Sequence, residues 1–284
     1  MDIYVKKAII HQFSPDDTDL YLADKFLNIT PKIEEYLRKK IERVYSDEAR
    51  TGIFEEDNPF LEMISDDLLE TSVVVANRWK EEFVVSENQK TNDLVFIQFS
   101  KEGVDHFAFL RIALRETLTH LGGEVDNPIK LTQNNLPGFG TGADEALVIN
   151  LQSRKYHLIE KRIKYNGTFL NYFSENLLQA QPKISPKKSI KALEKTAQKI
   201  AESFNTDDFQ FQSKVKSAIF NHIEEENKLS PEKLANDLFD DNLTARLSFI
   251  DQVKEAVPEP VTFEEIDASR QLKKFENQKL SLSN

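Results

Sequence analysis

The feature of this sequence that most constrains its fold is a pair of β-rich runs with almost nothing between them. The runs LVFIQFS (94–100) and VDHFAFLRIAL (104–114) are separated only by Lys101, Glu102 and Gly103. A short loop that contains glycine is typical of a β-hairpin, so the two runs are expected to be adjacent antiparallel strands. A second pair is predicted from ALVINL (146–151) and YHLIEKRI (156–163). The first 180 residues are therefore expected to contain an antiparallel sheet.

Helical patterns flank these strands. Thr30-Pro31 is a start signal, because Thr can cap free N–H groups and Pro is tolerated at the first helical position. The apolar residues that follow recur at three-to-four spacing: Ile33, Leu37, Ile41 and Val44. Asn58-Pro59 repeats the signal and predicts two helices or one broken helix. After Asn166-Gly167 a further helix is predicted, with one apolar face formed by Phe169, Tyr172, Phe173 and Leu177.

Two prolines in QPKISP (181–186) discourage a continuing helix and predict a boundary. Beyond it, apolar residues again follow a helical period: Ile190, Leu193, Ala197, Ile200 and Phe204. The expected fold class is α+β, with an antiparallel sheet flanked by helices and followed by a mainly helical C-terminal region. The expected divisions are an α+β domain (1–182), a helical region (183–257) and a C-terminal segment (258–284), which is interpreted as the start of a truncated strand region.

The amino-acid composition limits the classes of function that this chain can have. Cysteine is absent, which excludes disulfides, Cys-based zinc sites and thiol nucleophiles. The first residues lack the apolar stretch of a signal peptide, and no run of about 18 apolar residues could span a bilayer, so a cytoplasmic protein without membrane contact is expected.

The net charge of the chain is negative, because 37 Lys and Arg against 48 Asp and Glu leave a formal charge of −11. Because non-specific DNA affinity comes from neutralising phosphates, DNA contact would need a local basic patch or a partner protein.

Two stretches carry a charge opposite to that of the whole chain. RKYHLIEKRIKYNG (154–167) holds five basic residues and one acid, and 187–203 holds five lysines against two acids, or +3. By contrast, 224–267 holds 13 acids against four bases, or −9. The candidate DNA contacts are Arg154, Lys155, Lys161, Arg162, Lys164, Lys187, Lys188, Lys191 and Lys195. The alternative, that these charges are simply solvated, stays open.

The motifs associated with nucleotide or metal binding are incomplete. The loop LPGFGTGADEA (136–146) has three glycines, but it leads into a strand and carries Asp144 and Glu145, which would repel phosphate. A mobile surface loop is expected there. The five histidines show no HxH or HExxH spacing, so no metal site and no cofactor are expected.

A metal-dependent nuclease is the enzymatic alternative. Such a site needs an acidic residue on one strand and Glu-x-Lys on the next, to hold a divalent metal and activate water. Asp144 or Glu145 followed by Glu160-Lys161-Arg162 approximates this pattern. However, Glu160 and Lys161 are adjacent and would point to opposite faces of a strand. A non-enzymatic protein is therefore the leading hypothesis.

Several segments together resemble the bacterial 37-kDa nucleoid-associated protein family. They are IIHQF near the start, IERVYSDEARTGIF around residue 50, HFAFLRIAL, LP…DEALVINL, LIEK, NYFS, and Ser185 before a lysine-rich helix. Their order and spacing carry the resemblance, which covers residues 1 to about 205 and runs more loosely to 275. The resemblance implies association with the nucleoid, direct or through a partner. It supplies no catalytic residues to transfer.

The leading hypothesis is a bacterial nucleoid-associated protein in the cytoplasm that contacts DNA phosphates without reading sequence. The main alternative is an adaptor that reaches the nucleoid by binding a protein partner through its acidic helical region. Other nucleoid proteins and a second copy of the chain, forming a homodimer, are the further partners considered.

Overall fold

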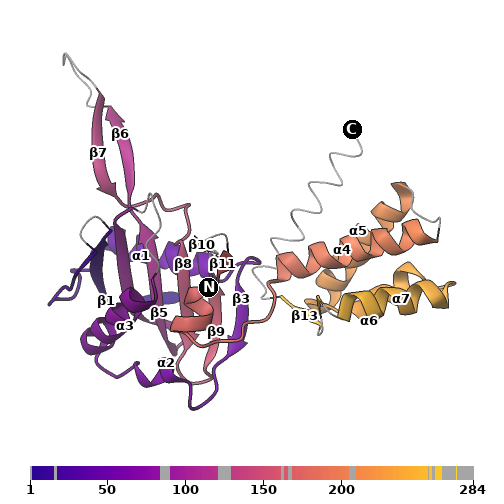
Figure 1. Ribbon diagram of the computed structural model, residues 1–284, viewed down its shortest axis with the longest axis horizontal. Helices are drawn as coiled ribbons and strands as arrows, with labels where there is room; N and C mark the ends of the chain where they lie inside the picture. Colours follow the sequence, from indigo (N-terminus) through magenta and orange to yellow (C-terminus); the bar gives the residue numbers. More distant parts are fainter. Residues whose placement is uncertain are drawn as a thin grey trace. The chain divides into compact units, whose positions relative to one another are not determined.

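The computed structural model describes residues 2–15, 18–83, 90–120, 129–160, 163–165, 168–204, 209–254, 256–257, 260–263 and 273. The chain divides into two compact units, and each is described by itself (Figure 1). Unit 1 comprises Met1–Val44 and Thr51–Lys183, and unit 2 comprises Tyr45–Arg50 and Ile184–Asn284. Of the predicted C-terminal segment 258–284, most residues lie outside the described part of the chain.

A seven-stranded sheet forms the centre of unit 1, in the order β2-β1-β4-β5-β8-β9-β3. Its strands are β1 (Ile3–Ser14), β2 (Asp19–Tyr21), β3 (Arg50–Ile53), β4 (Asn92–Lys101), β5 (Val104–Ala113), β8 (Glu145–Asn150) and β9 (Lys155–Ile159). The β4–β5 and β8–β9 pairs are antiparallel and match the two predicted hairpins. With helices packed on the sheet and following it, the predicted α+β class is confirmed.

Helices cover both faces of this sheet. On one face, α3 (Leu68–Glu82) packs against β1 and β4, and Trp79 and Phe96 belong to a single buried cluster. On the other, α1 (Pro31–Val44) contacts β1, β8 and β9 through residues outside that cluster, such as Leu37 and Ile41. Successive strand residues point to opposite faces, so a strand covered on both sides must be apolar throughout. This requirement explains the unbroken run LVFIQF in β4, where every residue but Gln98 is buried.

The predicted helix starts are confirmed. Thr30 Oγ1 accepts a hydrogen bond from the Ile33 N–H at 3.4 Å at the start of α1. Asn58 caps the short α2 (Pro59–Glu62) by accepting from the Phe60 N–H at 2.9 Å. The 59–82 region therefore holds two separate helices, α2 and α3.

Two local predictions were wrong. Strand β9 ends at Ile159 rather than at 163, and the region after Asn166-Gly167 is not one amphipathic helix. Instead β10 (Ile163–Tyr165) pairs with β11 (Thr168–Leu170), so Phe169 belongs to a strand, and a single π-helical turn, η1 (Phe173–Leu177), follows. Asn-Gly is the strongest two-residue hairpin signal, and strand pairing across it prevailed over the helical period.

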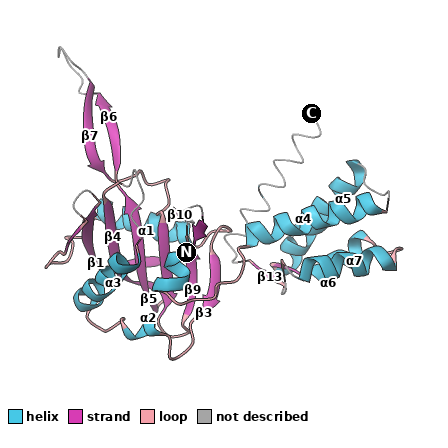
Figure 2. Cartoon of the chain, viewed as in Figure 1, coloured by secondary structure: helices cyan, strands magenta, loops and turns pink. Residues whose placement is uncertain are grey.

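A two-stranded ribbon that was not predicted extends from unit 1 (Figure 2). It consists of β6 (Arg115–His120) and β7 (Ile129–Asn135). Leu118 lies opposite Leu131 in the register, and their exposed fractions are 72% and 52%. The ribbon is therefore held mainly by its own cross-strand pairs.

Unit 2 is mainly helical. It contains α4 (Pro186–Ser203), α5 (Phe209–Glu226), α6 (Pro231–Leu238) and α7 (Leu243–Lys254), with the short pair β12 (Lys228–Leu229) and β13 (Val261–Thr262). The predicted apolar stripe of α4 is buried at Leu193 and Ala197, against residues such as Phe249 of α7. Among the described helices, none is long and apolar enough to cross a membrane.

The fully buried His11 should make the stability of unit 1 depend on pH. Its Nδ1 accepts from the Ala23 N–H at 3.0 Å, which leaves Nε2 to donate to Ser72 Oγ at 2.9 Å, so the ring is neutral. Burial lowers the pKa of His11 to about 4 from 6.5. As pH falls from 6.5 to 4, the unfolded state therefore takes up a proton that the folded state refuses, and stability is lost by up to about 3 kcal/mol.

Urea unfolding followed by the fluorescence of Trp79, the single tryptophan, measures this loss. We expect His11→Gln to be less stable than the unsubstituted protein at pH 7 and to approach it at pH 4. A constant difference across this range would contradict the assignment.

Candidate nucleic-acid interface

Arg154 and Lys155 lie at the turn between β8 and β9. Arg154 adopts a left-handed backbone conformation (φ +58°), and its carbonyl accepts from the Phe54 N–H at 3.1 Å. Its guanidinium pairs with Glu56 Oε1 at 2.9 Å, with the two side chains 36% and 84% exposed. Exposed ion pairs contribute little, so this pair would not prevent Arg154 from meeting a phosphate. Lys155 is exposed at the first position of β9.

The centre of the same stretch lies largely outside the described residues. Lys161 and Arg162 lie outside the described residues, and Lys164 is described only as the middle residue of β10. The predicted contacts through these three residues stay predictions.

The lysines of α4 form a row along its exposed side. Ser185 precedes the helix and Pro186 begins it, which fits the preference for proline in the first turn. The apolar positions turn toward the core of unit 2, so Lys188, Lys191, Lys195 and Lys199 are left exposed. At 100° and 1.5 Å per residue, these four, here called the α4 lysine row, fall within an arc of about 80° and span about 16 Å.

The α4 lysine row lacks ion-pair partners within the part of the chain that the structure describes. Glu194 is close to Lys191, but burial raises the pKa of Glu194, with Lys216 and Lys191 acting against that rise. Lys187 differs from the row, because it donates to Glu48 and the Lys187 N–H donates to the Asp47 carbonyl at 2.9 Å. The Glu48 hydrogen bond raises the pKa of Lys187.

The carboxylates of the nuclease alternative have other partners. Glu145 is fully buried, and its oxygens accept from Arg111 Nε at 2.9 Å and Arg111 Nη2 at 3.1 Å. The Tyr172 hydroxyl donates to the same carboxylate and accepts from the Trp79 indole N–H at 3.2 Å. Burial raises the pKa of Glu145, and Arg111 acts against that rise, while Glu145 raises the Arg111 pKa above its ordinary value. The two parallel hydrogen bonds from the guanidinium favour the ionic form of the pair.

Glu160 and Asp144 are also engaged. Glu160 Oε1 accepts from the backbone N–H groups of Phe173 and Ser174 at 2.9 and 3.1 Å, and it thereby caps the π-helical turn. Asp144 Oδ2 accepts from the Ala113 N–H at 3.0 Å. Among the described residues, no group of three or more His, Asp or Glu is arranged to hold a metal ion. The geometry thus gives the nuclease hypothesis no support.

The comparison with protein families decides the wider class. A model of the family described as nucleoid-associated protein YejK matches residues 9–284, which is nearly the whole chain. The chain belongs to this family. A search of curated proteins returned no match. The resemblance to nucleoid-associated proteins drawn from the sequence is confirmed, and a nucleoid-associated role in bacteria is supported.

In this member of the YejK family, the glycine loop is attached to α1 by contacts that the sequence did not predict. Lys40 of α1 is fully buried, and its Nζ donates to the carbonyls of Pro137, Gly138 and Thr141 at 3.2, 2.9 and 2.6 Å. Sequence reasoning missed both Lys40 and Arg111. The signal was present, because Lys40 falls on the apolar stripe of α1 and Arg111 interrupts the apolar run FAFLRIAL.

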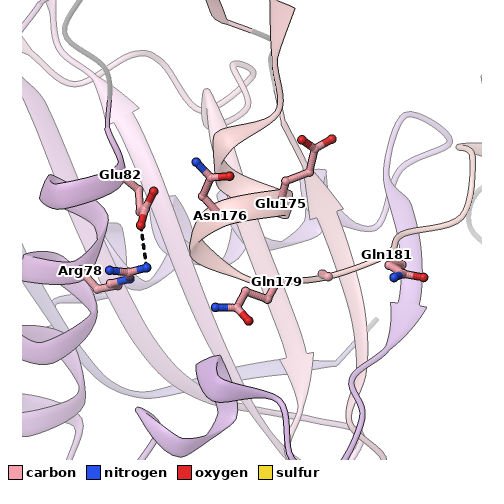
Figure 3. Close-up of a pocket in the computed structure, with 7 residues that line it drawn as sticks. Arg78, Glu82, Glu175, Asn176, Gln179 and Gln181 are labelled. Carbon is pink, nitrogen blue, oxygen red and sulfur yellow. Dashed lines mark ion pairs between the residues drawn. The ribbon is translucent and has the colours of Figure 1, made fainter.

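An open depression of about 570 Å³ lies on unit 1 between α3 and η1 (Figure 3). It is lined by Arg78, Glu82, Glu175, Asn176, Gln179, Ala180 and Gln181. Arg78 is already paired with Glu82 at 2.6 Å and with Glu81 at 3.0 Å. The seven residues that line the depression are mostly polar, and they do not converge on one point as catalytic groups would.

Removing the charge of Glu145 should destabilise unit 1 strongly. Glu145→Gln leaves the buried Arg111 guanidinium uncompensated, and we expect a loss of about 3 to 5 kcal/mol. Glu81→Gln, at an exposed pair with Arg78, should cost less than about 1 kcal/mol. Urea unfolding followed by Trp79 fluorescence measures both variants, and an equal small loss would contradict an ionic Arg111–Glu145 pair.

Proposed function

We propose that this chain is a non-enzymatic nucleoid-associated protein that contacts DNA phosphates without reading base sequence. The observation that carries the proposal is the α4 lysine row: four exposed lysines on one side of a helix, in a chain of net charge −11. Like charges three and four residues apart repel, and an anion that lies along the row would relieve that repulsion. The protein would act in the cytoplasm, at the nucleoid.

The dimensions of the α4 lysine row suit a run of phosphates. A DNA strand carries one phosphate per 3.4 Å of helix axis, so 16 Å of axis holds about five phosphates. Successive phosphates also turn around the axis, so the straight row can meet only some of these five. Arg154 and Lys155 on unit 1 are a second candidate contact, together with Lys161, Arg162 and Lys164.

The chemistry of the row argues against base recognition. Bases are read in the major groove mainly by Arg or Lys at guanine and by Asn or Gln at adenine, and single strands are held by stacking on aromatic rings. The helix PKKSIKALEKTAQKIAES has no arginine, asparagine or aromatic residue, and Gln198 is its one amide side chain. Lysine acts as a point charge toward phosphate, which supports binding that depends on salt and not on sequence.

The second candidate function is a protein adaptor at the nucleoid. It is favoured by the net charge of −9 over 224–267 and by the exposure of acids such as Glu224, Glu225 and Asp240. This acidic part of unit 2 would repel DNA and could bind a basic surface of another nucleoid protein. Homodimer formation would belong to the same class of contact.

Replacing three lysines of the row should weaken DNA binding and its salt dependence. In the variant Lys191→Gln, Lys195→Gln, Lys199→Gln, the slope of log K against log salt should fall by about 2 to 3, because each phosphate contact contributes about 0.9. The matched control replaces three exposed lysines elsewhere: Lys32, Lys80 and Lys228. Titration of long duplex DNA from about 50 to 200 mM salt measures both variants.

Three outcomes separate the candidates. An equal fall in both variants would remove the α4 lysine row as the contact. Absence of binding even at about 50 mM salt, with protein partners retained in a pull-down after nuclease treatment, would favour the adaptor. Cleavage of DNA in the presence of Mg²⁺ or Mn²⁺ would contradict the non-enzymatic assignment.

A further inference from the structure

A buried lysine occupies the junction between α1 and the ribbon. Lys40 is 0% exposed, and all three of its ammonium protons are used, because Nζ donates to three backbone carbonyls at 3.2, 2.9 and 2.6 Å. These carbonyls belong to residues 137, 138 and 141, which lie in one five-residue stretch of the glycine loop. The oxygens converge on one charge, as they would around a bound cation.

The aromatic neighbours of Lys40 hold the same loop. Lys40 Nζ lies 4.5 Å from the centre of the Tyr36 ring, a cation–π distance. The Tyr36 hydroxyl donates to the Pro137 carbonyl at 3.1 Å, and the Tyr36 ring meets the Phe139 ring edge-on with centres 5.4 Å apart. The loop is therefore attached to α1 by hydrogen bonds, by charge and by ring packing.

The loop is the root of the β6–β7 ribbon. It begins directly after β7 and ends at Asp144, whose side chain binds the Ala113 N–H at the end of β5, two residues before β6 begins. Burial lowers the pKa of Lys40 to about 8, with Arg115 and Arg43 adding to this effect and Asp144 opposing it. Arg115, the first residue of β6, is thus close enough to Lys40 for its positive charge to lower the pKa of Lys40. The ribbon itself extends away from the sheet (Figure 1).

We propose that Lys40 acts as an internal cation that clips the glycine loop onto α1 and thereby sets the position of the β6–β7 ribbon. The three carbonyls cannot be satisfied by an apolar side chain, and a buried acceptor without a donor destabilises the arrangement that contains it. Without the charge, the loop would turn these carbonyls toward water and leave the ribbon free to change direction. This inference goes beyond DNA contact and does not depend on it.

The first test compares two neighbouring lysines on α1. Lys40→Met keeps the apolar stem and removes the charge, whereas Lys39→Met removes a charge at a partly exposed position paired with Glu42. In hydrogen exchange on the full chain, we expect the loop and ribbon amides of Lys40→Met to exchange at least about tenfold faster than those of Lys39→Met. Equal rates in the two variants would overturn the proposal.

A second test restores the cation chemically. Lys40→Ala deletes the Cγ, Cδ, Cε and Nζ atoms, which n-propylammonium replaces in size, charge and donors. Added n-propylammonium should slow the loop exchange of Lys40→Ala back toward that of the unsubstituted protein. Tetramethylammonium, which has charge without N–H donors, and 1-propanol, which lacks charge, are the controls. Equal recovery with 1-propanol would overturn the role of the charge.

The unsubstituted protein provides a measurement that needs no variant to fold. An ammonium group held by three buried acceptors exchanges its protons slowly, so one lysine Nζ resonance should show protected N–H protons at neutral pH. If all lysine ammonium groups exchange at the rate of exposed ones, the clip does not exist. DNA binding plays no part in these readouts, so their failure would be distinct from failure of the phosphate-contact proposal.

Discussion

The structure of unit 1 depends on burying both faces of one antiparallel sheet. The central strands β4, β5 and β8 have almost no exposed residue, so each of them needs apolar side chains on both sides and a helical layer above and below. A charged residue in such a strand needs an oppositely charged partner beside it, since an unpaired buried ion destabilises the folded protein. Arg111 and Glu145 on neighbouring strands β5 and β8 meet this condition directly, because they are opposite each other in the register.

The same condition explains why the polar residues of unit 1 were easy to misjudge. The carboxylates that approximate a nuclease pattern are each used by the fold: Glu145 by Arg111 and Tyr172, and Glu160 by the N–H groups of a π-helical turn. Lys40 is likewise used by the fold, because its ammonium group donates hydrogen bonds to three carbonyls of the glycine loop. In unit 2, by contrast, the α4 lysine row stays on the surface, which is where an electrostatic contact with a large anion has to be.

Much of the fold was predictable because its signals are local. The β4–β5 hairpin follows from two β-rich runs and a glycine loop, and the starts of α1 and α2 follow from Thr30 and Asn58 before proline. The lysines of α4 were predicted on one helix, and the apolar stripe fixed which side they occupy. The β6–β7 ribbon was missed because RETLTH and IKLTQNN have no core-facing pattern, and Phe169 was assigned to a helix although strand pairing decided its conformation.

Local patterns in the sequence account for the antiparallel sheet, the helical character of the second unit and the separation of basic from acidic segments. Each of these depends on periodicity, turn residues or composition, which act over a few neighbouring residues. The family resemblance rests instead on the order and spacing of motifs along the chain. The partners of the buried charges follow from the tertiary fold, because Arg111 meets Glu145 across 34 residues and Lys40 meets Pro137 across 97. Partners so distant in the chain are selected by the packing of strands and helices, and no local pattern in the sequence specifies them.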